Sequence, residues 1–234
     1  MTENRFEQEL NKLGIKLTHE QLGQFNRYYE LLIEWNEKIN LTSIVKKEDV
    51  YLKHFYDSAT IAKVIDLEKE ESLCDIGTGA GFPGIVLKIL FPNLKITLID
   101  ALEKRIKFLN LVIQELDLKK IETVHARSEE YGIKNREMYD VVTARAVATL
   151  PVLIEYCVPL VKTGKYFIPM KANISQEIIL SKNAVNQLNL KVMKIEEFLL
   201  PYENSNRTII LYLKEKATSK IFPRKNSDIK KKPL

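Results

Sequence analysis

A glycine-rich segment constrains the fold of this chain more than any other feature. Residues 74–84 read Cys-Asp-Ile-Gly-Thr-Gly-Ala-Gly-Phe-Pro-Gly and hold four of the eight glycines. A strand-like apolar segment precedes them, and a helix-like apolar segment, residues 85–91, follows. Because glycine has no Cβ, the backbone can turn tightly here and approach a ligand closely. A glycine-rich turn from strand to helix predicts a nucleotide-like cofactor at the edge of an α/β sheet.

Strand-like and helix-like segments alternate along the rest of the chain. We expect helices near 102–116, 150–161 and 175–188, and strands at 72–76, 95–99, 121–125, 139–144 and 166–170. This alternation predicts a parallel sheet with helices on both faces. The link between the last two strands, 191–197 and 208–213, is too short for a helical crossover, so these strands should pair antiparallel. We therefore predict an α/β, Rossmann-like fold with a seven-stranded, mostly parallel sheet.

The segment before this alternation is expected to be helical. Thr18 and Gln21 form a capping-box pattern, and apolar residues then recur at helical spacing as far as Ile39. Asn40 is expected to cap or brace this helix, and a second helix is expected at 47–65. We predict three parts: a helical extension (1–68), a cofactor-binding domain (69–213) and a basic C-terminal tail (214–234).

Positive charge is concentrated in the tail. The whole chain has a net charge of +5, whereas residues 214–234 hold eight basic and two acidic side chains, so the preceding residues are close to neutral. A short basic tail predicts contact with a polyanion such as RNA, and the alternative is a solvated tail that only aids solubility.

Composition excludes several classes of protein. The sequence has no apolar stretch of ~20 residues and no signal-peptide pattern, so we expect no membrane association. The chain has only two cysteines, Cys74 and Cys157, so we expect no disulfide framework. This cysteine usage favours a cytoplasmic location. The three histidines show no ligand spacing with the cysteines, which predicts no metal site. We expect a monomer.

The glycine segment allows two cofactor interpretations. Residues 79–84 fit the dinucleotide pattern G-x-G-x-x-G, which alone is weak evidence for NAD. Asp75 and Gly77 instead extend the pattern to Asp-x-Gly-x-Gly-x-Gly, and a carboxylate suits a cationic cofactor without phosphate, such as S-adenosylmethionine. Asp100, at the end of the second strand, could accept hydrogen bonds from ribose hydroxyls or could cap the next helix.

The ends of the third and fourth strands supply further candidates. Ser128 and Glu129 could hydrogen-bond an adenine edge, although the same pair suits an ordinary helix N-terminus. The fourth strand ends at Arg145 without the Asn/Asp-Pro-Pro-aromatic motif of amino-methylating enzymes. This absence favours a nucleophile with an in-plane lone pair and no proton to lose, such as guanine N7. Arg145 would then hold the phosphate or base of the target.

Several motifs together resemble one known family. These are Trp35-Asn, Asn40-Leu-Thr, His54-Phe-Tyr-Asp57-Ser, the loop ending in Gly-Phe-Pro-Gly84, Asp100-Ala-Leu-Glu-Lys-Arg, Arg145-Ala-Val-Ala and the tail from Phe222. The chain resembles the bacterial small-subunit ribosomal RNA guanine-N7 methyltransferases, also called glucose-inhibited division protein B. The resemblance implies a class I methyltransferase fold with an N-terminal helical extension. It also implies S-adenosylmethionine as the donor and a guanine N7 in the 530 loop of 16S rRNA, in the small ribosomal subunit, as the acceptor.

The resemblance and the motifs together give three sets of candidate residues. Those expected to bind the cofactor are Asp75, Gly77, Gly79, Phe82, Asp100, Ser128, Glu129 and Arg145. Those expected to be catalytic are Arg145, Lys171 and Arg207. Those expected to bind RNA are Arg127, Arg145, Lys171, Arg207, Arg224 and Lys225. His54 and Asp57 match a family motif to which the sequence assigns no role beyond packing.

Three other functions remain open at this stage. An RNA cytosine-C5 methyltransferase would need Cys74 or Cys157 as a nucleophile. An NAD dehydrogenase would need an acid or base for hydride transfer near the strand ends, and none is evident. A non-catalytic RNA-binding or ribosome-assembly protein could retain a vestigial pocket.

Overall fold

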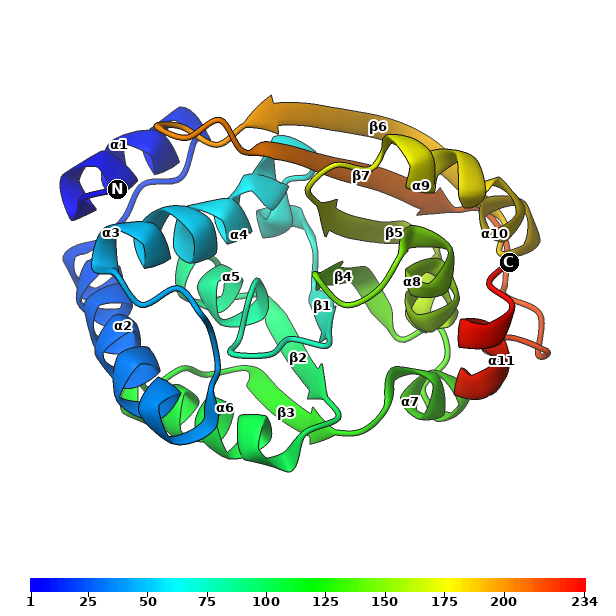
Figure 1. Ribbon diagram of the computed structural model, residues 1–234, viewed down its shortest axis with the longest axis horizontal. Coiled ribbons are helices and arrows are strands. Elements are labelled where there is room, and N and C mark those ends of the chain that lie inside the picture. Colours follow the sequence, from blue (N-terminus) through cyan, green and yellow to red (C-terminus); the bar gives the residue numbers. More distant parts are fainter.

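A seven-stranded sheet forms the centre of the computed structural model, which describes residues 1–234 (Figure 1). Its spatial order is β3-β2-β1-β4-β5-β7-β6. The strands are β1 (Ser72–Ile76), β2 (Lys95–Asp100), β3 (Ile121–His125), β4 (Tyr139–Arg145), β5 (Val161–Lys171), β6 (Leu190–Leu199) and β7 (Asn206–Lys214). Strands β1 to β5 run parallel, and β7 pairs antiparallel with both β5 and β6. The predicted fold class and the terminal antiparallel pair are confirmed.

Helices cover both faces of this sheet (Figure 1). Contacts with β2 and β3 place α5 and α6 on one face, where α2 packs over them, whereas α8 and α10 lie against β4, β5 and β6 on the other. The α-helices are α1 (Glu3–Lys12), α2 (His19–Ile39), α3 (Lys47–Val50), α4 (Asp57–Ala59), α5 (Gly84–Leu90), α6 (Glu103–Glu115), α7 (Ser128–Lys134), α8 (Leu150–Cys157), α9 (Ser175–Leu180), α10 (Lys182–Gln187) and α11 (Asn226–Lys231).

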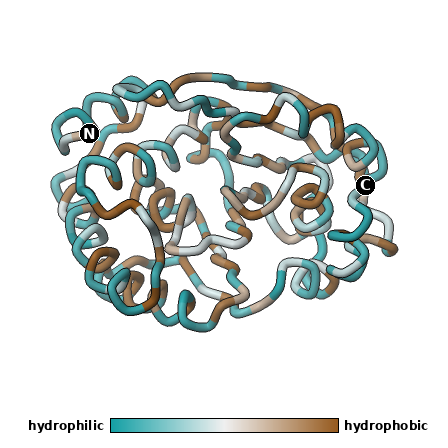
Figure 2. Tube along the Cα trace, viewed as in Figure 1, coloured by the Kyte–Doolittle hydropathy of each residue, from teal (hydrophilic) through white to brown (hydrophobic).

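The N-terminal helices share a hydrophobic core with one face of the sheet. A single buried cluster contains Phe6, Phe25 and Phe55 from the extension together with Ile85 and Leu98 from the cofactor-binding part. A second cluster fills the other face beneath α8. Figure 2 shows hydrophobic stretches of the trace mainly in the interior and hydrophilic ones along the outer helices. The predicted boundary at residue 68 stays a prediction, but the shared core ties the extension to the sheet.

Local signals explain where α2 begins and ends. The Thr18 hydroxyl accepts a hydrogen bond from the Gln21 backbone N–H, and the Gln21 side-chain oxygen accepts one from the Thr18 backbone N–H, which completes the predicted capping box. Asn40 ends the helix with φ of 49°, a left-handed conformation that asparagine tolerates better than most residues. The predicted capping role of Asn40 is confirmed.

The helix expected at 47–65 is not one regular helix. It consists of α3, a π-helical turn at Tyr51–Tyr56, α4, and a 3-10 turn at Thr60–Lys63. The wide π turn carries His54 and delivers the chain to Asp57 at the start of α4. Single π turns inside helices occur frequently at functional sites, because they shift the direction of the side chains that follow.

Two other expected helices are also interrupted. The α-helix that begins at Leu150 ends at Cys157 and continues as a 3-10 turn, because Pro159 has no N–H to donate. The helix expected at 175–188 divides into α9 and α10 at Ser181, whose hydroxyl donates to the Ile178 carbonyl. Such a side-chain bond competes with the helical backbone bonds.

The C-terminal segment packs against the rest of the protein, which opposes the alternative of a tail that is wholly solvated. Phe222 and Ile229 are buried in the cluster beneath α8. Arg224, predicted to bind RNA, instead pairs with the fully buried carboxylate of Glu155, with Nη2 2.6 Å from Oε2. A buried carboxylate needs a charged partner, so Arg224, whose side chain is 25% exposed, is held in place by this ion pair. Its neighbour Lys225 is exposed and makes no ion pair.

This packing predicts that the two neighbouring cations of the tail differ in their effect on stability. Arg224→Gln should lower the free energy of unfolding by about 2 kcal/mol or more, because it leaves Glu155 buried without its cation. The matched control, Lys225→Gln, should change it by less than about 0.5 kcal/mol. Urea denaturation of the two variants provides the comparison, and equal effects would contradict the structural role of Arg224.

Candidate active site

A buried carboxylate holds the glycine-rich loop between β1 and α5. The Oδ2 atom of Asp75 accepts hydrogen bonds from Thr78 Oγ1 at 2.6 Å and from the backbone N of Gly84 at 2.8 Å. Burial raises the pKa of Asp75 to about 7, and its Oδ1 atom has no partner. A Cβ at position 84 would lie 2.2 Å from Leu98 Cδ2, so this position requires glycine. Asp75 therefore fixes both ends of the loop.

The N-terminal extension braces the same loop from outside. The hydroxyl of Tyr28 donates to the carbonyl of Ala80, and both groups are buried. Gly81 has φ of 99°, and a Cβ there would lie 2.6 Å from the Tyr28 hydroxyl oxygen. The close approach of α2 thus requires a residue without a side chain at position 81.

Two adjoining cavities lie at this edge of the sheet. The smaller cavity, of about 260 Å³, opens where β1, β2 and β3 end. Its walls combine apolar side chains with a few polar groups, the usual character of a small-molecule site. The lining includes Gly77, Ile99, Asp100, Arg105, Ser128 and Val147. This edge, at the carboxyl ends of parallel strands, is where doubly wound α/β folds bind nucleotide-like ligands.

Asp100 is the principal acceptor in the smaller cavity. Its Oδ1 accepts from the Leu102 backbone N at 2.9 Å, and its Oδ2 accepts from the Gly79 backbone N at 3.0 Å and from Arg105 Nη1 at 3.1 Å. Both interpretations of Asp100 thus have support: it caps the following turn, and it lies in the lining where ribose hydroxyls would reach it. Gly79, at φ of 64°, directs its N–H to this carboxylate.

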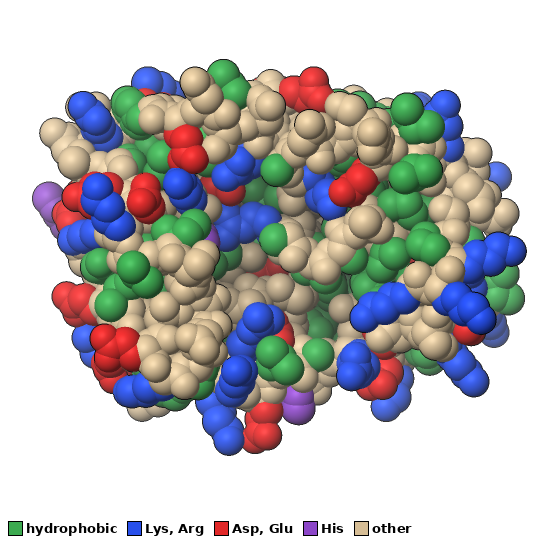
Figure 3. Space-filling model, in the orientation of Figure 1, with side chains coloured by type: hydrophobic (Ala, Val, Ile, Leu, Met, Phe, Trp, Pro, Cys, Tyr) green, Lys and Arg blue, Asp and Glu red, His purple; other side chains and the backbone are tan.

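A larger cavity, of about 450 Å³, adjoins the first and is strongly charged. Its cations are Lys53, Arg145, Lys171 and Arg207, and its carboxylates are Asp57 and Glu177. Lys171 Nζ lies 2.8 Å from a Glu177 oxygen, and both arginines contact Asp57. Figure 3 shows Lys and Arg side chains in and around the hollow on this face of the molecule. The three predicted catalytic cations are thus brought together in one cavity.

Arg145 and His54 meet above the ring of Phe82. The His54 ring stacks on Phe82 with centroids 4.4 Å apart, and the Arg145 guanidinium lies 5.3 Å from the Phe82 centroid. Arg145 Nη2 lies 3.4 Å from His54 Nδ1, and His54 Nε2 lies 2.9 Å from Thr42 Oγ1. Burial, helped by the Arg145 charge, lowers the pKa of His54 to about 3. His54 is therefore neutral, accepts from Arg145 at Nδ1 and donates to Thr42 from Nε2.

Ala146 joins the two cavities. It follows β4 directly, lines both cavities, and has φ of 57°, which is uncommon for a residue other than glycine. Backbone strain of this kind costs of order 1–3 kcal/mol and clusters at functional sites. A ligand in the smaller cavity can therefore present one end to a ligand in the larger cavity.

Only some of the predicted cofactor residues line a cavity. Gly77, Asp100 and Ser128 line the smaller cavity, and Arg145 lines the larger one. Asp75 and Phe82 are buried behind the linings, where they support the loop, and their predicted contact with the cofactor stays a prediction. Glu129 is buried in the first turn of α7, outside the lining. Arg127 is exposed immediately before that helix.

Six further residues that the site argument uses were missed, or given no role, by the sequence analysis. They are Lys53, His54, Asp57, Arg105, Ala146 and Glu177. Arg105 could have been found from its spacing of five residues after Asp100, in the first turn of α6. Asp57 and Glu177 come from segments far from β4 in sequence, so only the fold reveals their partners.

Neither cysteine is placed to act as a nucleophile. Cys74 lies in β1 and Cys157 at the end of α8, and both are fully buried. Burial raises the pKa of each thiol well above its ordinary value. An RNA cytosine-C5 methyltransferase needs an accessible thiolate, so the geometry opposes this alternative.

No helix has the length and hydropathy that crossing a membrane requires. No three side chains among His, Cys, Asp and Glu are grouped so that they could hold a metal ion.

The neutral state of His54 predicts a specific acid sensitivity. As the pH falls from about 6.5 towards 3, the unfolded chain gains a proton at His54 that the folded protein does not, so stability falls. Between pH 7 and pH 5 the wild type should lose unfolding free energy, and this loss should be about 2 kcal/mol smaller in His54→Gln. In NMR titrations, a His54 ring signal that changes between pH 5 and pH 7 would contradict this.

Solved structures share the fold at low sequence identity. One is a SAM-dependent methyltransferase from Aquifex aeolicus, with a TM-score of 0.55, 15% identity, and coverage of 77% of this chain and 98% of that one. Another is M. jannaschii TYW2 in complex with AdoMet, with a TM-score of 0.57, 12% identity, and coverage of 74% and 79%. These likenesses establish the class I methyltransferase fold.

Closer relatives match over the whole length. The family described as GidB, rRNA small subunit methyltransferase G, matches residues 21–207. Proteins named ribosomal RNA small subunit methyltransferase G from Lysinibacillus sphaericus and Bacillus cytotoxicus are each 49% identical to this chain, covering all of it and at least 99% of the relative. The family expected from the motifs is therefore confirmed, and the chain belongs to the rRNA small subunit methyltransferase G family.

Proposed function

We propose that this protein transfers a methyl group from S-adenosylmethionine to N7 of a guanine in the 530 loop of 16S rRNA. One observation carries the proposal: two cavities, one suited to a nucleoside and one rich in guanidinium groups, meet at Ala146. Membership of an rRNA methyltransferase family supports an RNA substrate. We further propose that the protein acts as a monomer in the cytoplasm, on the rRNA of the small ribosomal subunit.

The smaller cavity fits the adenosine part of the donor. Asp100 would accept from the ribose hydroxyls, Ser128 offers a hydroxyl to the adenine edge, and the apolar walls would enclose the base. Gly77 supports this fit, because a Cβ there would lie 2.6 Å from Val147 Cγ2, at the cavity wall. When bound, S-adenosylmethionine supplies an activated methyl group on a sulfonium. The protein contributes placement and a fixed electrostatic environment.

The larger cavity suits an acceptor that needs no proton removed. Both nitrogens of His54 are engaged, and His54 is neutral because of its lowered pKa. The two carboxylates, Asp57 and Glu177, are engaged in ion pairs with cations of the cavity. No group is thus free to act as a general base. Guanine N7 has an in-plane lone pair and no proton, so this cavity supports N7 better than an exocyclic amine.

The cations of the larger cavity would hold the RNA strand. Arg145 and Arg207 retain N–H groups that no protein acceptor uses, and guanidinium groups recognise phosphate well. Lys171 lies close to Glu177 and could reach the base or its phosphate. The exposed Arg127 and Lys225 would add contacts to the RNA backbone outside the cavity.

The first experiment tests the reaction itself. The gene for this chain is removed from its host, and the 530 loop of 16S rRNA is analysed by mass spectrometry. We expect N7-methylguanosine to disappear from the loop and to return when the wild-type gene is restored. Persistence of the modification in the deletion strain would refute the proposed function. The alternative, a non-catalytic RNA-binding protein, predicts no change in the rRNA and no calorimetric binding of S-adenosylmethionine.

Arg145 should affect transfer more than it affects donor binding, because it lines only the larger cavity. Arg145→Ala should lower kcat by about 100-fold or more while the Kd for S-adenosylhomocysteine changes by less than about threefold. Single-turnover methylation of rRNA and calorimetry measure the two quantities. Equal losses in both would place Arg145 in the donor site instead.

A further inference from the structure

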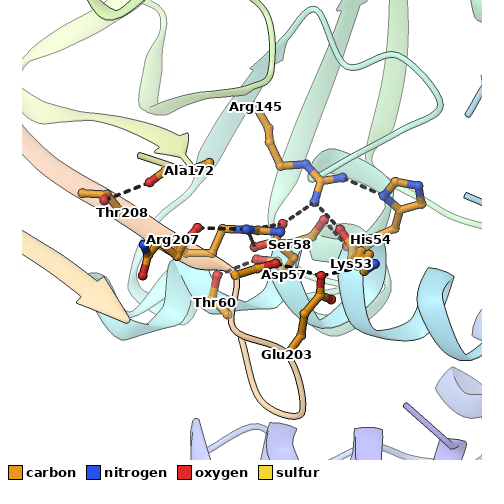
Figure 4. A network of polar contacts seen from close by, with 12 residues as sticks. Lys53, His54, Asp57, Ser58, Thr60, Arg145, Ala172, Glu203, Arg207 and Thr208 are labelled. Atoms are coloured by element: carbon orange, nitrogen blue, oxygen red, sulfur yellow. Dashed lines mark hydrogen bonds and ion pairs between the residues drawn. The ribbon is translucent and has the colours of Figure 1, made fainter. Parts of the chain in front are cut away.

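We propose that Asp57 is a positioning residue that holds Arg145 and Arg207 as one paired site for a phosphate of the acceptor RNA. The proposal rests on the proposed function and gives a role to the His54–Asp57 motif. It explains why an RNA-binding cavity contains a buried carboxylate, which would otherwise repel the RNA. Figure 4 shows both arginine side chains converging on Asp57.

The contacts of Asp57 involve both of its oxygens. Arg207 Nε lies 3.0 Å from Oδ1 and 3.0 Å from Oδ2, and Arg145 Nη1 lies 3.1 Å from Oδ2. The Asp57 side chain is only 6% exposed, and those of Arg145 and Arg207 are 14% and 19% exposed. One carboxylate thus fixes two nearly buried guanidinium groups that come from β4 and β7.

The two arginines keep donors for a ligand. Arg145 Nη1 donates to Asp57 and to the Lys53 carbonyl, and Arg145 Nη2 approaches His54. The Nε of Arg145 is left without a protein acceptor. Arg207 Nε donates to Asp57 and Arg207 Nη1 donates to the Asn206 carbonyl, so the Nη2 of Arg207 is left without a protein acceptor. These unused N–H groups belong to side chains that line the larger cavity, where a phosphate oxygen could accept them.

Charge balance favours a single phosphate. Two guanidinium groups side by side repel each other, and the pKa of Arg145 is lowered by burial while the charge of Asp57 opposes that shift. Two cations and one carboxylate leave one net positive charge, which a phosphodiester would neutralise. Asp57 therefore allows the pair to exist before RNA arrives without cancelling its attraction for an anion.

The backbone around Asp57 is held on several sides, as positioning requires. Asp57 begins α4 directly after the π turn, and its carbonyl accepts from Thr60 Oγ1. In the preceding turn, the Lys53 carbonyl accepts from Arg145, while Lys53 Nζ lies 3.3 Å from Glu203 (Figure 4). The extension thus delivers Asp57 to the cavity on a constrained segment, and small displacements there would move both arginines.

The test compares Asp57→Asn with a control of equal charge change. Asp49→Asn also removes one negative charge from the extension, but Asp49 contacts neither arginine and lies 3.9 Å from Lys53 Nζ. For each variant we would measure kcat with small-subunit rRNA, the Kd for that RNA at low salt, and the Kd for S-adenosylhomocysteine. Asp57→Asn should lower kcat by about 10-fold or more, with RNA binding at low salt no weaker than in the wild type and the donor Kd within about twofold. Asp49→Asn should keep kcat within about twofold of the wild type.

Two outcomes would overturn the proposal. If Asp57 only reduced the positive charge of the cavity, Asp57→Asn would bind RNA more tightly with unchanged kcat. If Asp57 only supported the loop, its loss would weaken donor binding as much as it lowers kcat. Wild-type protein without any methylation activity would refute the proposed function instead, so the two failures are distinguishable.

A second variant covers the case in which Asp57→Asn does not fold. Arg207→Lys keeps the positive charge but loses the planar fork that can contact Asp57 and a phosphate together. Positioning through the pair predicts a kcat at least about 10-fold lower for Arg207→Lys, with donor binding intact. Full activity of Arg207→Lys would show that the site needs charge alone, which would overturn the proposal.

Discussion

The packing around Phe82 is the contact on which the rest of the site depends. Phe82 belongs to the glycine-rich loop, yet its ring stacks on His54 and lies 5.5 Å from the Tyr28 ring, both of which come from the extension. Its other neighbour is the Arg145 guanidinium, at the end of β4. Stacking and cation–π contacts of this kind each contribute of order 1 kcal/mol. One side chain therefore ties the glycine-rich loop, the extension and the larger cavity together.

This arrangement divides the reaction between two sets of residues. The carboxyl ends of β1, β2 and β3 provide backbone turns and one carboxylate in the cavity lining, Asp100, which suit a nucleoside. Strands β4, β5 and β7, with the π turn of the extension, provide paired charges, which suit an RNA strand. Because His54 is neutral and every carboxylate of the acceptor cavity is in an ion pair, the site is built for placement rather than for proton transfer.

Sequence reasoning succeeded where the signal was local. The alternation of strand-like and helix-like segments predicted all seven strands to within a few residues, except that β5 begins five residues earlier than expected. The capping box correctly predicted the start of α2. It failed where tertiary contacts decide. Arg224 appeared as one cation in a basic tail because nothing local indicates the buried Glu155, and Asp57 had no role until β4 and β7 brought two arginines to it. Asp75 and Phe82 were recognised as important, but the sequence could not distinguish contact with a ligand from support behind it.

The central claim is that donor and acceptor occupy different cavities that meet at Ala146. An experimental structure of the protein with S-adenosylhomocysteine and a guanine-containing RNA fragment tests it most directly. We expect ribose hydroxyls on Asp100, the sulfur atom directed past Ala146, and the guanine in the larger cavity with N7 facing the sulfur. An adenosine in the larger cavity, or a sulfur atom directed away from Arg145, would contradict it.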